Sequence, residues 1–133
     1  PLEGAGTHAD PIRIDALPFS DLRDTRDAQE HRNDLYPGCD AEQNEAGPEI
    51  VYTLELDAPA NIRALVLDRG DVDIDLHLLG RSDDPGTCLQ RAHTDLRASL
   101  DAGRWSFVLD TWVDAAGAAQ AGEFLFVVVK ESE

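Results

Sequence analysis

The residues whose types and spacing could do chemistry are densest in the stretch 69–80, RGDVDIDLHLLG. Asp71, Asp73 and Asp75 alternate there, and carboxylates spaced by two could gather a hard cation such as calcium, together with loop carbonyls. A calcium-binding EF-hand loop also needs glycine at its sixth position and glutamate at its twelfth. Counted from Asp71, those positions hold leucine and serine. We therefore predict no bound metal and no cofactor; if calcium does bind, Asp71, Asp73 and Asp75 are the candidate ligands.

The same stretch has the alternation of a β-strand that is buried on one face. Successive side chains of a strand point to opposite sides of the sheet. One set is apolar and should face the core: Val72, Ile74, Leu76 and Leu78. The other set, Asp73, Asp75 and His77, then forms a solvated face, as in half-buried antiparallel strands.

An Arg-Gly-Asp triplet precedes this strand at residues 69–71. Cell-adhesion motifs carry the same three letters, but so short a match arises often by chance. Gly70 stands where a hairpin turn needs a positive φ. We interpret the triplet as turn chemistry.

Catalytic motifs are missing from the sequence. It has no GxSxG nucleophile elbow, no HExxH zinc helix and no glycine-rich phosphate loop. The four histidines, His8, His31, His77 and His93, lie in unlike contexts, and we expect solvated side chains rather than an acid–base or metal site. The chain is therefore predicted not to be an enzyme.

Trp105 and Trp112 stand near the two ends of the apolar run 104–113. They are seven residues apart, so strict alternation places one in the core and the other on the surface. An exposed tryptophan can stack on a sugar ring, because its flat apolar face matches a pyranose. The two tryptophans are the candidate ligand-binding residues, and packing against the loop 114–122 is the alternative.

Composition narrows the classes of partner. Among 133 residues, 27 acidic side chains stand against 11 basic ones, for a net charge of −16. Such a surface repels phosphate backbones and anionic lipids, so nucleic acid and membranes are poor partners. No apolar run approaches the roughly 20 residues that span a bilayer. Polysaccharide or an extracellular protein remains as the candidate partner, and we expect the chain to be a monomer.

The only cysteines are Cys39 and Cys88. Neither belongs to a CxxC motif or to a cluster with zinc-ligand spacing. A lone pair in an acidic, strand-rich chain without methionine favours one disulfide in an exported protein, and two separate buried thiols are the alternative.

Short strand-like segments follow one another at regular intervals and are separated by turn signals. The expected strands are 11–19, 49–57, 61–68, 72–80, 87–93, 96–101, 104–113 and 123–131. About eight short strands without a helical period predict an all-β fold, an antiparallel β-sandwich of the jelly-roll type. Residues 1–10 are expected to be a loose lead-in, and 11–133 a single domain. Residues 20–48 are polar and rich in turn formers, which predicts a long surface loop with a short helical turn near 27–32.

The order and spacing of several segments resemble the bacterial pre-peptidase C-terminal domain, in the versions found in secreted proteins of myxobacteria and their relatives. These segments are LPFSDLRDT (17–25), YPGCD (36–40), GPEIVYTLEL (47–56), DVDIDLHLL (71–79), LRASLDAGRWSFVLDTWVD (96–114) and FLFVVV (124–129). The resemblance covers roughly residues 10–130. It implies a jelly-roll-like sandwich and supports the bridge between Cys39 and Cys88.

Domains of this family are appended to secreted peptidases and other exported proteins and are not themselves catalysts. Collagenase relatives bind calcium through an acidic segment ahead of the first strand. Here that segment holds only Glu3 and Asp10, a departure that argues against such a site.

The resemblance thus implies a non-catalytic accessory domain that aids secretion, folding or attachment to matrix or glycan. Its place would be secreted, periplasmic or at the cell surface, with a catalytic domain in the same precursor. The alternative is a small exported hydrolase whose active groups come from the 20–48 loop and the strand ends.

Overall fold

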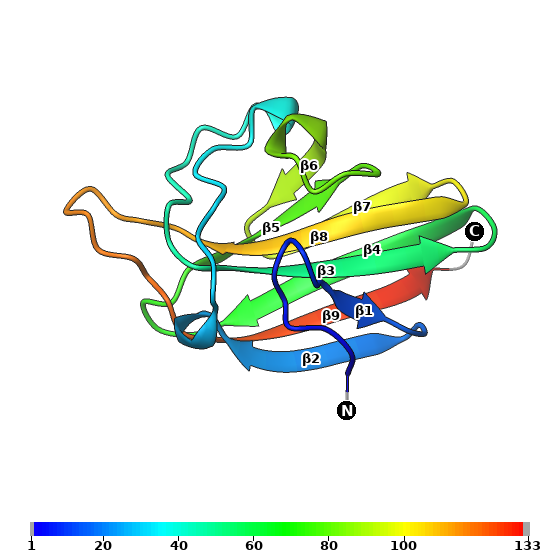
Figure 1. Cartoon of the computed structure of the whole chain (residues 1–133), viewed down its shortest axis with the longest axis horizontal. Helices are drawn as coiled ribbons and strands as arrows, with labels where there is room; N and C mark the ends of the chain where they lie inside the picture. Colours follow the sequence, from blue (N-terminus) through cyan, green and yellow to red (C-terminus); the bar gives the residue numbers. More distant parts are fainter. Residues whose placement is uncertain (1, 132–133) are drawn as a thin grey trace.

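The computed structural model describes residues 2–131, which form a sandwich of two β-sheets (Figure 1). One sheet has five strands in the order β1-β3-β8-β5-β6, and the other has four in the order β2-β9-β4-β7. All neighbours are antiparallel except β1 and β3. The strands are β1 (Ile12–Ile14), β2 (Phe19–Asp24), β3 (Glu49–Leu56), β4 (Ala60–Asp68), β5 (Ile74–Leu79), β6 (Cys88–Ala92), β7 (Asp95–Leu100), β8 (Gly103–Thr111) and β9 (Glu123–Glu131). The predicted all-β sandwich is confirmed.

The described residues contain nine strands rather than about eight, because the expected strand 11–19 is two strands in different sheets. β1 pairs with β3, and β2 then pairs with β9 in the other sheet. Between them lies Pro18, which has no N–H to give to a ladder. The prediction that 20–48 is entirely loop is wrong for residues 20–24, which continue β2.

The core between the sheets contains the apolar face predicted for 72–80. Ile74, Leu76 and Leu78 are buried there, and Val72 packs half-buried against the same cluster. Three aromatic rings, Phe107, Phe126 and Tyr52, fill the centre of the sandwich. The Arg-Gly-Asp triplet lies in the turn before β5, where Gly70 has a φ of 64°; the turn is confirmed, but it joins two sheets and is not a hairpin turn.

Residues 25–48, which we call the cover segment, begin beside β9, where the Thr25 N–H donates to the Gly122 carbonyl at 2.9 Å, and then pass over the outer face of the five-stranded sheet. They contain two short 3-10 helices, η1 (Thr25–Asp27) and η2 (Pro37–Cys39). The helical turn expected near 27–32 is therefore displaced to η1, where the Asp24 side chain accepts a hydrogen bond from the Arg26 N–H. The cover segment buries a second apolar cluster against the sheet: Tyr36, Ala41, Val51, Leu79, Cys88 and Val108.

A disulfide between Cys39 and Cys88 fixes the cover segment to β6, as predicted. In Figure 1 η2 lies beside η3 (Pro85–Thr87), just ahead of β6. The two turns approach closely enough that a Cβ added at Gly38 would lie 2.4 Å from the Gly86 carbonyl oxygen. A glycine is therefore required at position 38.

The described part of the lead-in, residues 2–10, contacts the sandwich, contrary to the loose segment we expected. Leu2 packs against the core, and the Val51 N–H donates to the Gly6 carbonyl at 2.9 Å. The His8 side chain is only 3% exposed. Within residues 2–131 no helix has the length and apolar character that crossing a membrane requires.

Candidate functional site

The outer face of β5 is polar but buried. Asp75 and His77 have no exposed surface, and Asp73 is half-buried just ahead of the strand. The predicted solvated face is therefore wrong for Asp75 and His77. The reason is that the cover segment lies on this side of the sheet, so residues that alternate outward meet protein instead of water.

His77 lies between an aromatic ring and a carboxyl group. The Tyr36 ring stacks on its imidazole at a centroid distance of 3.6 Å and an interplanar angle of 13°. Its Nε2 lies 3.2 Å from Glu45 Oε2, and its Nδ1 lies 3.3 Å from the Val108 carbonyl oxygen. Burial lowers the pKa of His77 to about 3, so this histidine is neutral at pH 7.

Glu45 reaches β5 from the cover segment and is fully buried beside Asp75. Burial, followed by the neighbouring Asp75, raises the pKa of Glu45 to about 10. Burial also acts to raise the pKa of Asp75, but hydrogen bonds with Glu45 and His93 and the charge of Arg91 hold it below its ordinary value. Arg91 Nη2 lies 2.7 Å from Asp75 Oδ2. Glu45 is therefore a neutral acid against an ionised Asp75.

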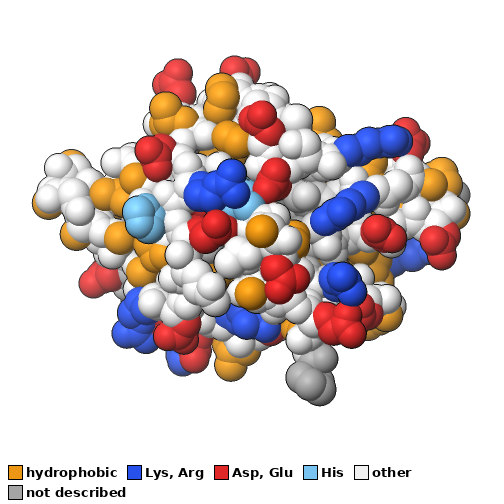
Figure 2. All heavy atoms as spheres, in the orientation of Figure 1, with side chains coloured by type: hydrophobic (Ala, Val, Ile, Leu, Met, Phe, Trp, Pro, Cys, Tyr) orange, Lys and Arg blue, Asp and Glu red, His pale blue; other side chains and the backbone are white. Residues whose placement is uncertain are grey.

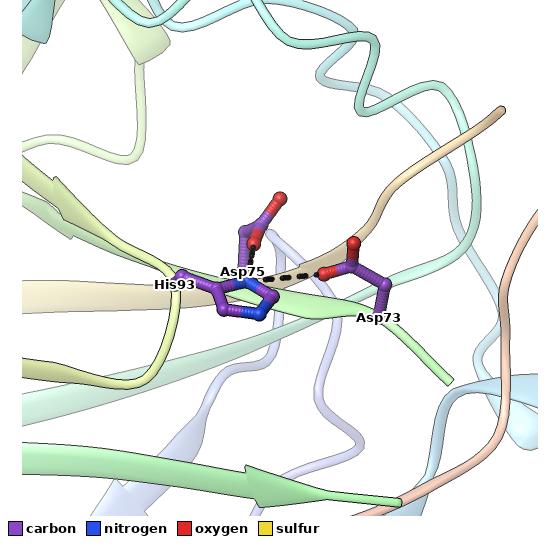
Figure 3. A group of neighbouring side chains, drawn as sticks. All are labelled: Asp73, Asp75 and His93. Atoms are coloured by element: carbon purple, nitrogen blue, oxygen red, sulfur yellow. Dashed lines mark hydrogen bonds and ion pairs between the residues drawn. The ribbon is translucent and has the colours of Figure 1, made fainter. Parts of the chain in front are cut away.

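Asp73, Asp75 and His93 meet at the entrance to β5 (Figure 3). His93 Nδ1 lies 3.1 Å from Asp75 Oδ1 and 3.4 Å from Asp73 Oδ1. Burial and then the charge of Asp75 raise the pKa of Asp73 to about 6. Among the described residues, these three offer ligand atoms that all lie within 4.8 Å of one another and could share a metal ion.

A second buried polar group lies on the neighbouring strands. The Tyr36 hydroxyl donates to Asp110 Oδ2 at 2.6 Å, and both side chains are fully buried. His8 Nε2 contacts Glu49 Oε2, while its Nδ1 lies 2.7 Å from Asp83 Oδ2. The carboxylate of Glu49 also accepts from the Asn33 N–H of the cover segment at 2.7 Å. These contacts join the lead-in, the cover segment and the sheet.

Of the three aspartates proposed as calcium ligands, the structure brings two together. Asp71 is exposed in the turn and lies outside the group, whereas Asp73 and Asp75 converge on His93. The expectation that the histidines are solvated holds for His31 and for the exposed His93, but it is wrong for His8 and His77.

The two tryptophans do not divide into one core residue and one exposed residue, because both are half-buried. Trp105 packs against the core, and its Nε1 donates to the Asp101 carbonyl at 3.0 Å. Trp112 follows the end of β8 beside the loop 114–122, where its carbonyl accepts from the Gln120 N–H at 2.9 Å. Their role in ligand binding stays a prediction.

Sequence reasoning missed Glu45, Arg91 and His93. One signal was present: Arg91 and His93 alternate as Asp73 and Asp75 do, and hairpin pairing of the two segments places such residues opposite one another. The register confirms this, with His77 opposite Arg91 and Leu76 opposite Ala92. Nothing local marked Glu45, which lies in a polar loop 30 residues before Asp75.

The surface also has a shallow polar hollow of about 600 Å³ beside β1. It is lined by the end of the lead-in and by residues of β1, β3 and β8, including Arg13, Glu55 and Arg104. Figure 2 shows one face of the molecule, on which acidic and basic side chains lie interspersed. A hollow of this composition suits a polar ligand better than an apolar one.

Comparison with known proteins identifies the fold. No protein-family model matches the sequence, and no curated protein matches it. Among solved structures, the pre-peptidase C-terminal domain of a collagenase from Bacillus anthracis matches 87% of this chain and 91% of that domain, with a TM-score of 0.57 and 14% identity.

A domain named CBM36-1, from a multidomain xylanase of the hindgut metagenome of Trinervitermes trinervoides, covers 82% of this chain and 96% of its own. Its TM-score of 0.35 and identity of 11% are too low to bear on function. The first match confirms the resemblance that the sequence indicated, at the level of the fold: this chain has the fold of a pre-peptidase C-terminal domain.

Proposed function

We propose that this chain is a non-catalytic accessory domain of an exported protein, joined to a catalytic domain in the same precursor. Its role would be attachment to an extracellular polysaccharide or protein. The fold it shares with a collagenase domain supports this proposal, as does the disulfide, since such bonds persist in oxidising compartments.

The observation that carries the proposal is the burial of the groups best suited to chemistry. Glu45, His77 and Asp110 have strongly shifted pKa values, which in an open cleft would suggest catalysis. All three are fully buried, so no substrate can reach them. Their partners belong to the cover segment and the sheet, which is the arrangement of structural polar contacts.

A hydrolase is the second candidate, because loop and strand groups do meet as that hypothesis requires. Glu45 of the cover segment lies 3.2 Å from His77 of β5. For this pair to act, the cover segment would have to leave the sheet, although the disulfide holds it there.

One set of assays separates the two candidates. The purified chain is incubated with insoluble polysaccharides and with collagen, and the bound fraction is measured; the same protein is screened for peptide, ester and glycoside hydrolysis. We expect saturable retention on one of these matrices and no turnover. Turnover that Glu45→Gln abolishes would establish the hydrolase and overturn the accessory role.

The tryptophans provide the variants for the binding arm. If Trp105 or Trp112 contacts the ligand, alanine at that position reduces retention at least tenfold, and titration with soluble ligand changes the tryptophan fluorescence. Leu89→Ala, which alters a side chain that is 56% exposed on β6, is the matched control and should retain binding. Retention that is unchanged in both tryptophan variants would move the ligand site elsewhere, with the hollow beside β1 as the next surface to test.

A further inference from the structure

A group of ligand atoms lies near the surface, at side chains that range from exposed to buried. His93 is 61% exposed and Asp73 is 27% exposed, whereas the Asp75 side chain is only 1% exposed. The His93 Nδ1 points at both carboxylates, as Figure 3 shows. An ion would enter beside the exposed His93 side chain and meet three ligands held by two neighbouring strand segments.

A second observation concerns the hydrogen bonding of Glu45, which lies beside Asp75. Its side chain is fully buried and receives no hydrogen bond from the described residues, and as a neutral acid it donates its own proton to Asp75. Asp73 Oδ1, which faces His93, also lacks a hydrogen bond. Buried polar atoms are normally satisfied, so the acceptor oxygens without donors at Asp73 and Glu45, both neighbours of Asp75, indicate a missing ligand.

The charges of the group point to the sign of the charge on that ligand. Three carboxylates lie together, those of Glu45, Asp73 and Asp75. The fixed positive charge paired with them is Arg91, whose Nη2 lies 2.7 Å from Asp75 Oδ2. Because Glu45 is a neutral acid, the ionised carboxylates are those of Asp73 and Asp75, and with Arg91 and a neutral His93 the group keeps one net negative charge, which favours a cation.

We propose that Asp73, Asp75 and His93 bind a divalent transition-metal ion of the zinc class, with Glu45 as a buried acid that supports Asp75. The ligand types decide the class of ion. Calcium and magnesium take oxygen ligands, whereas an imidazole nitrogen beside carboxylates suits zinc and its neighbours. The site includes His93 and excludes Asp71, so it differs from the all-aspartate set that the sequence suggested.

The test is calorimetric titration of chelator-treated protein with zinc chloride at pH 7, using the wild-type chain and four variants. We expect one zinc ion per wild-type chain. Asp73→Asn and His93→Gln should each weaken zinc binding at least tenfold, because each removes a ligand. Both side chains are partly exposed, so these variants should fold, as checked by circular dichroism.

Two matched controls share the residue types but lie outside the group. Asp71→Asn and His31→Gln alter exposed side chains and should bind zinc as the wild type does. Cobalt provides a second readout, since its visible absorption should include an imidazole ligand in the wild type and change in His93→Gln.

Three results would overturn the proposal. The first is the absence of saturable zinc binding to the wild type. The second is equal affinity in wild type, Asp73→Asn and His93→Gln, which would place the ion elsewhere. The third is tighter binding of calcium than of zinc at this group, which would overturn the assigned class of ion.

Discussion

The two sheets differ in what they do with their outer faces. The outer face of the five-stranded sheet carries acids and a histidine, yet it is buried: Glu49, Asp75, His77 and Asp110 have no exposed surface. One part of the outer face of the four-stranded sheet carries aliphatic side chains, yet it is open, with Leu22 63% exposed and Leu67 53% exposed; another part carries the ion pairs Arg63–Asp95 and Arg97–Glu131. In the register of that sheet, Leu125 lies between these two leucines.

This contrast reverses the usual interpretation of strand alternation, in which polar residues face water and apolar ones face protein. Alternation determines which residues share a face, but not what covers that face. A segment elsewhere in the chain covers one face here and leaves the other open. The covered face must then satisfy its polar groups with hydrogen bonds, because an unpaired buried polar group costs free energy.

The disulfide should make the largest contribution to keeping the first face covered. The two cysteines are 49 residues apart in sequence, for which the chain-entropy model gives about 4 kcal/mol. We expect Cys39→Ser combined with Cys88→Ser to lower the free energy of unfolding by about this amount, as measured by urea denaturation.

Hydrogen exchange of the same double variant locates the loss. Amides of β5 and of the cover segment should exchange faster, while those of β4 and β9 should change only as far as global stability falls. A loss below about 1 kcal/mol would show that the polar contacts alone hold the cover segment in place.

Tyr36→Phe should have the next largest effect. It keeps the ring that stacks on His77 and removes the hydroxyl that donates to Asp110 at 2.6 Å. Burial, and then the negative charge of Glu49, raises the pKa of Asp110 well above its ordinary value. The buried carboxyl would lose a partner, so we expect a loss of about 2 kcal/mol in unfolding free energy.

Tyr52→Phe is the matched control, since the Tyr52 hydroxyl donates to Asp21 at the same distance, 2.6 Å. Asp21 is partly exposed and keeps its ion pair with Arg23, so the control should lose less. Equal losses of unfolding free energy would show that a hydrogen bond under the cover segment contributes no more to stability than one elsewhere.

His8 should make the stability of the covered face depend on pH. Burial acts to lower the pKa of His8, but the carboxylates of Glu49 and Asp83 outweigh it and hold this pKa above the ordinary 6.5. A raised pKa in the folded state means that the contribution is complete below pH 6.5 and is lost as pH rises through the folded value. His8→Gln should therefore cost about 1.5 kcal/mol at pH 6 and progressively less toward pH 9.

The comparison of wild type and variant at each pH removes the effect of the other buried acids, which are common to both. His31→Gln, at an exposed histidine, should give no such pH-dependent difference. A cost for His8→Gln that grows with pH would contradict the assigned charge of this histidine.

The fold was predictable from sequence because alternation and turns are local signals. Residues within a few positions of one another predict the apolar face of Ile74, Leu76 and Leu78 and the turn at Gly70. The Cys39–Cys88 bridge follows from the presence of two cysteines in the sequence. The division of 11–24 between two sheets did not, because no local pattern states which sheet a short strand joins.

The candidate site was predictable only in part, for a related reason. Asp73 and Asp75 were visible as a pair, and His93 was visible as a histidine, but their meeting depends on the β5–β6 register. Burial of Asp75 and His77 depends on where a polar loop of more than 20 residues lies. The composition of such a loop indicates solvent, and only tertiary packing reverses that expectation.

The smallest effect should come from the open face, where one substitution can be compared on both sheets. Val127 lies half-buried on the outer face of β9, opposite Leu65, and Val51 lies fully buried on the outer face of β3. Replacement by threonine preserves shape and strand propensity and adds a hydroxyl. On the open face that hydroxyl reaches water, so Val127→Thr should change the unfolding free energy by no more than about 0.5 kcal/mol.

Under the cover segment the same hydroxyl has no water, and Val51→Thr should cost about 1–3 kcal/mol unless a neighbouring carbonyl accepts from it. Urea denaturation of the two variants measures the difference directly. If Val127→Thr costs as much as Val51→Thr, then the aliphatic face of the four-stranded sheet is also covered in solution, by another molecule or another copy of the chain. Sedimentation at two protein concentrations would then identify a second copy of the chain, because self-association increases with protein concentration. Further valine-to-threonine substitutions on the same face should weaken that self-association.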